Sequence, residues 1–97
     1  MLEKLLSPDT IAVIGASRTP GKVGHEILAN LVNQGFGGTI VPINPTTDEI
    51  LGLKCYPSLK ESGIQIDLAV IAVATARVSD AIADSLAAGA GAICVIT

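Results

Sequence analysis

Apolar residues in this chain form short continuous runs that alternate with longer segments of helical spacing. An unbroken apolar run without polar alternation is typical of a strand covered on both faces, as in a parallel sheet. Runs of this kind predict strands at residues 11–14, 39–43, 67–73 and 92–97, and a shorter strand is expected at 52–56.

The segments between the runs carry apolar residues three and four positions apart, which gathers them on one side of a helix. This spacing predicts one helix at residues 20–34 and a second at 78–88. Residues 58–62 predict a single helical turn capped by Ser58, whose hydroxyl can accept from a free backbone N–H. A further short helix is expected at residues 2–6, lying over the sheet.

Strands that alternate with helices predict a doubly wound, Rossmann-like α/β sheet in one domain over residues 1–97. Right-handed crossovers predict a strand order of 3-2-1-4-5, with the helix at 20–34 on one face and the later helices on the other. The strands at 67–73 and 92–97 then keep an apolar side with no helix over it. We expect that side to be covered by a partner subunit in a homodimer, by the 2–6 helix or by a C-terminal continuation.

Ligands of open α/β sheets bind at the carboxyl ends of the strands, where the strand order reverses. In this chain the crevice would be built from the loops that follow Ile14, Ile43, Val73 and Ile96. The loop after Ile14 also leads into the first long helix, so we expect it to be the main ligand-binding loop.

Polar and cationic groups are concentrated in that first loop. Gly15 ends the apolar run, and hydroxyl groups, a guanidinium and several backbone N–H groups precede Pro20, which suits the first turn of a helix. The free N–H groups and positive end of a helix favour a phosphate, and Arg18 and Lys22 add two full charges. The loop therefore predicts an anion site.

Glycine spacing limits which class of nucleotide the loop can bind. The loop does not fit the dinucleotide motif G-x-G-x-x-G, because Ser17 occupies its second glycine position. A P-loop is excluded because Val23 stands where a Ser or Thr would hold magnesium. An NAD site would place an acid at the end of the second strand, where this chain has Asn44-Pro45. Two alternatives stay open at this point: an NAD(P)- or AMP-binding regulatory domain, and a dimerising half-Rossmann unit that binds nothing tightly.

Composition excludes several other classes. Hydrophobic residues make up 49% of the 97 residues, the mean hydropathy is +0.61 and the formal charge is −3. Six Lys and Arg in all are too few for a general nucleic-acid surface. The longest apolar run, residues 68–74, is far below the roughly 18 to 20 residues that span a bilayer. We therefore expect a cytoplasmic protein that binds neither nucleic acid nor membranes.

No set of residues predicts catalysis or a metal site. Cys55 and Cys94 are 39 positions apart without metal-ligand spacing, so we expect reduced, packed thiols. His25 falls in the middle of the first helix, away from the strand ends. Asp80 and Asp84 lie one helical turn apart, but a first-turn acid and a solvated residue explain them more simply than a carboxylate pair.

Four segments together resemble a known family. VIGASRTPGKVGHEILANL, IVPINPTTDEILGLKCYPSL, DLAVIAV and CVIT are similar to the N-terminal CoA-binding domain of NDP- or ADP-forming acyl-CoA synthetases, relatives of the succinyl-CoA synthetase alpha subunit. The resemblance covers almost the whole chain. The resemblance implies that the chain is a CoA-binding module. This module is expected to be noncatalytic alone, since the 97 residues do not include the family's phosphohistidine domain. Its partners would be CoA and the remaining domains or subunits of such an enzyme.

The resemblance also implies site residues. The phosphates would meet the turn at Gly15 and the residues Ser17, Arg18, Thr19, Pro20 and Lys22. The adenosine would be bordered by Asn44, Pro45, Thr46 and Thr47. The nucleotide and pantetheine would face Val73, Ala74, Thr75, Ile96 and Thr97. Ala74 departs from the proline that such proteins often carry, and no basic residue directly follows Asn44-Pro45, so contact with the CoA 3′-phosphate is assigned to Arg18.

Overall fold

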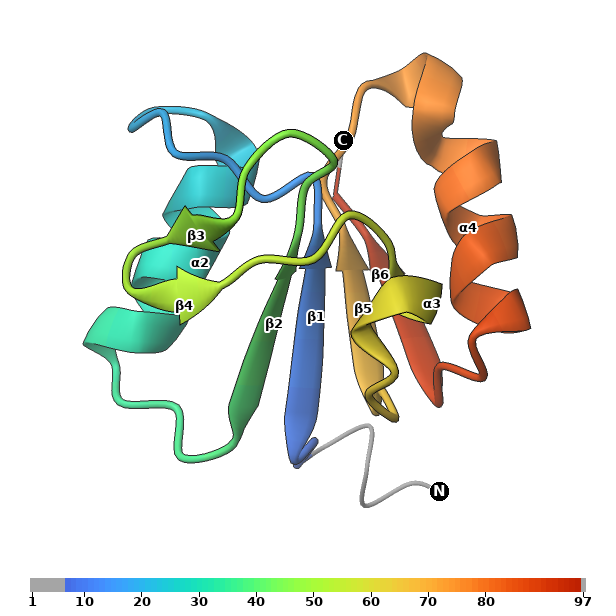
Figure 1. The fold of residues 1–97 in the computed structure, drawn as a ribbon, viewed down its shortest axis with the longest axis horizontal. Coiled ribbons are helices and arrows are strands. Elements are labelled where there is room, and N and C mark those ends of the chain that lie inside the picture. Colours follow the sequence, from blue (N-terminus) through green and yellow to red (C-terminus); the bar gives the residue numbers. More distant parts are fainter. Residues whose placement is uncertain (1–6, 97) are drawn as a thin grey trace.

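A four-stranded parallel sheet forms the centre of the protein, whose computed structural model describes residues 7–96 (Figure 1). Its strands are β1 (Thr10–Ile14), β2 (Thr39–Ile43), β5 (Leu68–Ile71) and β6 (Ala92–Val95), in the order β2-β1-β5-β6. In-register pairing places Ile43, Ile14, Ile71 and Val95 side by side. The carboxyl ends of all four strands therefore meet at one edge, and the predicted α/β fold is confirmed.

The third predicted strand folds instead as a hairpin. β3 (Glu49–Ile50) and β4 (Leu53–Lys54) pair antiparallel around Leu51 and Gly52. Both turn residues have positive φ, 53° and 79°, as a two-residue type I′ turn requires. Residues 53–54 of the strand predicted at 52–56 do form a strand, β4, but it pairs with β3 and not in the parallel sheet, because this turn reverses the chain.

Of the residues in the predicted third strand, only Tyr56, which follows the hairpin, pairs in parallel with β2. It forms a bridge with Ile43, donating its N–H to the carbonyl of Pro42 at 3.0 Å and accepting the N–H of Asn44 at 2.9 Å. The predicted order 3-2-1-4-5 therefore differs from the observed sheet in that its third strand is reduced to this single bridge.

Helices cover the two faces of the sheet. α2 (Val23–Asn33) packs Leu28 against Val13 of β1, whereas α3 (Leu59–Ser62) packs Leu59 in a cluster with Ala12. Ala12 and Val13 are neighbours in one strand, so their side chains point to opposite faces. α4 (Val78–Ala87) joins α3 on its face, after the 3-10 helix η1 (Thr75–Arg77) (Figure 1).

Two predicted helix starts have different outcomes. The first helix begins at Val23 with Lys22 as its N-cap, so the prediction that Pro20 occupies its first turn was wrong. The reason is Gly21, whose φ of +93° is incompatible with a helix and places Pro20 in a turn. The cap at Ser58 is confirmed, because its Oγ accepts from the N–H of Glu61 at 3.1 Å.

Exposed apolar surface is found on β6 rather than on both last strands. Val95 is 41% and Ile96 38% exposed, and Cys94 is exposed too, whereas Val70 of β5 is only 8% exposed. The prediction of a packed thiol was therefore wrong for Cys94, because no helix within residues 7–96 covers the last strand there. The predicted helix at residues 2–6 lies outside the described residues. Of the helices described, none has the length and apolar character to cross a membrane.

Candidate functional site

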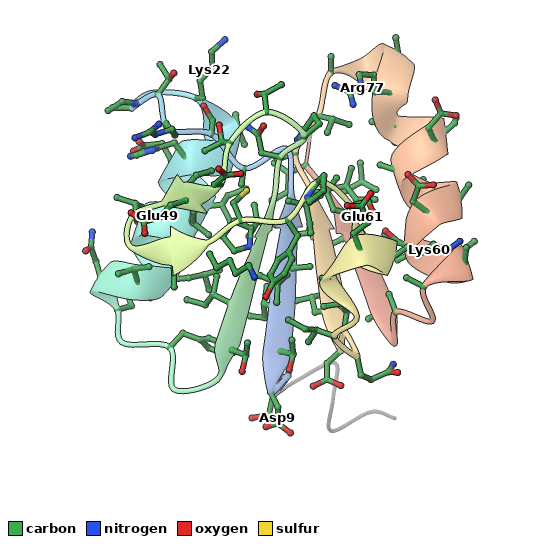
Figure 2. The ribbon with its side chains drawn as sticks, viewed as in Figure 1. Asp9, Lys22, Glu49, Lys60, Glu61 and Arg77 are labelled. Atoms are coloured by element: carbon green, nitrogen blue, oxygen red, sulfur yellow. The ribbon has the colours of Figure 1, made fainter. Side chains whose placement is uncertain are left out.

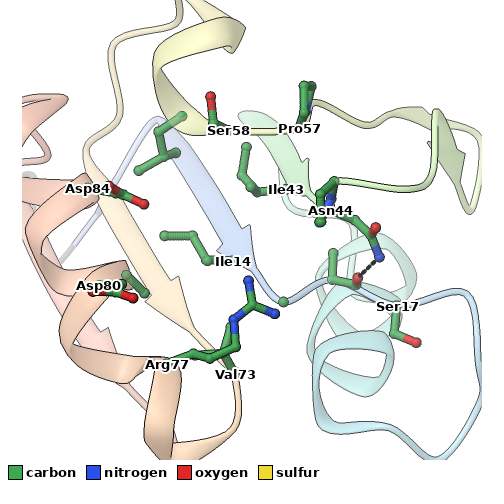
Figure 3. A pocket seen from close by; sticks show the side chains of 15 residues that line it. Ile14, Ser17, Ile43, Asn44, Pro57, Ser58, Val73, Arg77, Asp80 and Asp84 are labelled. Atoms are coloured by element: carbon green, nitrogen blue, oxygen red, sulfur yellow. Dashed lines mark hydrogen bonds between the residues drawn. The ribbon is translucent and has the colours of Figure 1, made fainter.

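A cavity of about 450 Å³ opens at the carboxyl ends of β1 and β2 (Figure 3). It lies at the point where the strand order reverses, between the loops that follow β1 and β5. Its apolar floor includes Ile14 and Ile43. We call it the strand-end cavity; its lining residues are Ile14, Gly15, Ala16, Ser17, Ile43, Asn44, Pro45, Pro57, Ser58, Leu59, Val73, Arg77, Asp80, Ala81 and Asp84.

A second cavity, of about 320 Å³, lies at the start of α2. We call it the helix-start cavity; its lining residues are Gly15, Ser17, Lys22, Val23, Gly24, Ala72, Val73, Ala74 and Ile96. Gly15, Ser17 and Val73 line both cavities. The two cavities therefore adjoin at the loops after β1 and β5.

Two glycines allow the loop after β1 to pack this closely. A Cβ on Gly15, whose φ is +90°, would overlap the carbonyl oxygen of Ala72 at the end of β5. A Cβ on Gly24, in the first turn of α2, would overlap the carbonyl oxygen of Gly15. Backbone carbonyls cannot move aside as a flexible side chain can, so both positions require glycine. The helix start is thereby held directly against the strand end.

Backbone donors at the start of α2 are free to bind an anion. Lys22 forms no side-chain cap, and its own N–H donates to the carbonyl of Thr19 at 3.2 Å. Among the described residues, no protein acceptor takes the N–H groups of Val23, Gly24 or His25. Unpaired donors at the positive end of a helix, beside a lysine, favour a phosphate. The helix-start cavity thus combines free backbone donors with Lys22, and anion binding there stays a prediction.

Asn44 joins the loops that follow β1 and β2. Its side-chain N–H donates to the carbonyl of Ala16 at 2.8 Å (Figure 3), and its Oδ1 accepts from the N–H and hydroxyl of Thr46 at 2.8 and 3.0 Å. Its carbonyl oxygen lies 3.9 Å from the Sγ of Cys55, a buried thiol whose pKa is raised above its ordinary value by burial. Asn44 therefore positions two walls of the strand-end cavity and has little bonding capacity left for a ligand.

Three cations lie at this edge of the molecule, and each lines a different cavity. Lys22 lines the helix-start cavity and Arg77 the strand-end cavity (Figure 2). Arg18 lines a third, of about 110 Å³, that we call the hairpin cavity; its other lining residues are His25, Glu49, Ile50 and Leu51. His25 is fixed there by a 2.9 Å hydrogen bond between its Nδ1 and the carbonyl of Ser17. Positive charge is thus spread around the strand ends.

Comparison with known families identifies the chain: residues 9–97 match the sequence pattern of the CoA binding domain. The chain belongs to the CoA binding domain family. It matches ADP-forming acetate–CoA ligase II of Archaeoglobus fulgidus with 48% identity over 83 residues, which are 86% of the chain and 12% of that enzyme. The resemblance seen in the sequence is confirmed.

Solved structures agree with this CoA-binding domain over most of its length. It covers 21% of dinucleotide-forming acetyl-coenzyme A synthetase 1 from Ca. Korarchaeum cryptofilum, solved with phosphate and ADP, with a TM-score of 0.96 and 47% identity over the entire chain. A conserved hypothetical protein from Pyrococcus furiosus matches 90% of the chain with a TM-score of 0.80 and 34% identity, and 73% of its own length is covered. The domain thus corresponds to a small part of the synthetases that it matches.

The residues predicted for the CoA-binding site are divided among these cavities. The strand-end and helix-start cavities together bring in Gly15, Ser17, Lys22, Asn44, Pro45, Val73, Ala74 and Ile96. Arg18 lies apart from them in the hairpin cavity. None of the three cavities is lined by Thr19, Pro20, Thr47 or Thr75, and Thr97 is outside the described residues. Thr46 donates its N–H and its hydroxyl to the Oδ1 of Asn44, which does line the strand-end cavity.

One wall of the strand-end cavity was missed by the sequence analysis of this CoA-binding domain. Asp80 was expected as a first-turn acid and Asp84 as a solvated residue, and the structure agrees, since Asp80 lies in the first turn of α4 and Asp84 is exposed. Neither was expected at the site, yet Arg77, Asp80, Ala81 and Asp84 all line this wall from η1 and α4. Their spacing of three, one and three residues places them on one face of a helix that follows a buried strand. This spacing was the sequence signal that could have indicated a wall of the cavity. Within the described chain, no cluster of metal-ligating side chains accompanies it.

Proposed function

We propose that this chain is the CoA-binding module of an ADP-forming acyl-CoA synthetase and binds CoA across the strand-end and helix-start cavities. The observation that carries the proposal is the pair of cavities joined over Gly15 and Ser17, at the reversal of strand order in a CoA binding domain. CoA is an elongated ligand with an adenosine, phosphates and a pantetheine arm, so its parts require neighbouring subsites of different chemistry.

Each part of CoA has a matching surface. The diphosphate suits the helix-start cavity, where Lys22 and the unpaired N–H groups of α2 lie together. The adenosine suits the strand-end cavity, whose floor of Ile14 and Ile43 is apolar and whose rim carries Asn44-Pro45. The pantetheine arm would follow the ends of β5 and β6, past Val73–Ala74 and Ile96. This arrangement would present the thiol beyond the sheet edge.

The module is inferred to contribute binding and orientation rather than chemistry. Holding the thiol in one position removes the entropy cost of bringing it to an activated acyl group. The activated acid would come from the other domains or subunits of the synthetase, and those partners, or a second copy of the chain, would cover the exposed side of β6. We further infer a cytoplasmic location and no requirement for a metal at the CoA site.

Calorimetric titration of the 97-residue chain with CoA, dephospho-CoA, NAD and NADP tests this function. We expect CoA to bind tightest, with NAD weaker by about tenfold or more, since the end of β2 offers no acid to the ribose of NAD. Tightest binding to NAD or NADP would replace the proposal by a dinucleotide-binding regulatory domain. Failure of all four ligands to bind would favour the dimerising unit without a ligand.

A further inference from the structure

Arg77 is the one cation among the described residues that line the strand-end cavity. It ends η1 and leads into α4, and Figure 3 shows its side chain pointing into the cavity toward the end of β1. No hydrogen bond or ion pair to its guanidinium is found within residues 7–96, so its N–H groups are not taken by Asp80 or Asp84. A charged group with this much unused bonding capacity is available for a ligand.

We propose that Arg77 binds the phosphate on the 3′-position of the CoA ribose and makes the site prefer CoA over dephospho-CoA. The inference rests on the proposed function, which places adenosine in the strand-end cavity and the diphosphate beside Lys22. The ribose joins these two parts, so its 3′-substituent faces the cavity that Arg77 lines. A guanidinium donates two parallel N–H bonds to phosphate oxygens, which is the geometry a terminal phosphate offers.

Arg18 was the residue assigned to this phosphate by the sequence. It lines the hairpin cavity with His25 and Glu49, and it is absent from the lining of the strand-end cavity. The loop after β2 offers no alternative, because Asn44-Pro45 is followed by two threonines and then by Asp48. The cation must therefore come from the opposite wall, where Arg77 lies.

The two aspartates on α4 restrict where a phosphate can bind in the strand-end cavity. Asp80 and Asp84 line the same cavity one turn apart and repel a phosphate from the remainder of that wall (Figure 3). Favourable potential is then restricted to the surroundings of the guanidinium. A phosphate placed elsewhere in the cavity would face two carboxylates, so the wall selects one orientation of the ribose.

Titration of the chain and its Arg77→Gln variant with CoA and with dephospho-CoA tests the proposal. We expect the substitution to weaken CoA on the order of tenfold, the loss typical of a charge-assisted hydrogen bond, and to leave dephospho-CoA within about twofold. Lys60→Gln, which removes an equal charge at an exposed position of α3, should change neither affinity. Circular dichroism checks that each variant is folded.

Two results would overturn the assignment of Arg77. Equal weakening of CoA and dephospho-CoA would place Arg77 elsewhere on the nucleotide. Loss of the preference for CoA in Arg18→Gln but not in Arg77→Gln would return the 3′-phosphate to the hairpin cavity. Failure of the proposed function gives a different result, because the unmodified chain would then bind neither CoA nor dephospho-CoA, and both proposals would fall.

Discussion

Replacing Gly24 with alanine is expected to lower the free energy of unfolding by about 3 kcal/mol or more. The added Cβ would overlap the carbonyl oxygen of Gly15, so α2 would have to move away from the loop after β1. That movement opens the buried contact of Leu28 with Val13 and displaces the helix start from the strand ends. Urea unfolding followed by far-ultraviolet circular dichroism measures the loss.

Gly37→Ala is the matched control for this variant. Gly37 lies in the loop after α2, and its φ is outside the left-handed region. Apart from its two chain neighbours, no residue has an atom within 4 Å of the position of its added Cβ. Its substitution should change the unfolding free energy by no more than about 0.5 kcal/mol. If Gly24→Ala were as stable as Gly37→Ala, the close approach of α2 to the loop would be incorrect.

Replacing Asn44 with alanine is expected to weaken CoA binding about tenfold and to lower the unfolding free energy by about 2 kcal/mol. The side chain donates to the carbonyl of Ala16 and accepts twice from Thr46, so its removal releases the loops after β1 and β2 together. Asn44 is therefore a positioning residue. Calorimetry measures the affinity, and thermal unfolding measures the stability.

Asn33→Ala controls for the loss of an asparagine side chain. Asn33 is exposed at the last turn of α2, and no hydrogen bond of its side chain is found within the described residues. We expect its CoA affinity to equal that of the unmodified chain. Wild-type CoA affinity in Asn44→Ala would show that the two loops keep their positions without this residue, contrary to our interpretation.

Local patterns were sufficient to predict the architecture. The uninterrupted apolar runs ending at Ile14 and Ile43 are typical of strands buried on both faces, and the helical spacing between them predicts a crossover helix. Chirality of that crossover then determined which loops share the ligand edge. Gly15, Ser17 and Lys22 could be expected at this edge because they follow the first strand directly, and they line the helix-start cavity there. That they bind the ligand stays a prediction.

Features that depend on contacts between distant segments could not be predicted in this way. A leucine at the first position of a type I′ turn is unfavourable locally, so the hairpin around Leu51 gave no turn signal there. The start of α2 was misjudged because Pro20 suits a first turn, but the positive φ of Gly21 overrides it. Arg77 gained its place only through the packing of α4 beside the sheet.

Amide chemical shifts recorded by two-dimensional NMR during titration with CoA test the central claim most directly. The account predicts that the largest changes fall at the carboxyl ends of the strands, at residues 15–24, at Asn44 and at residues 73–77. The amides of Asp9, at the opposite edge of the sheet (Figure 2), and of Gly91, directly before β6, should stay unchanged. Changes concentrated at that opposite edge, or no change at saturating CoA, would contradict it.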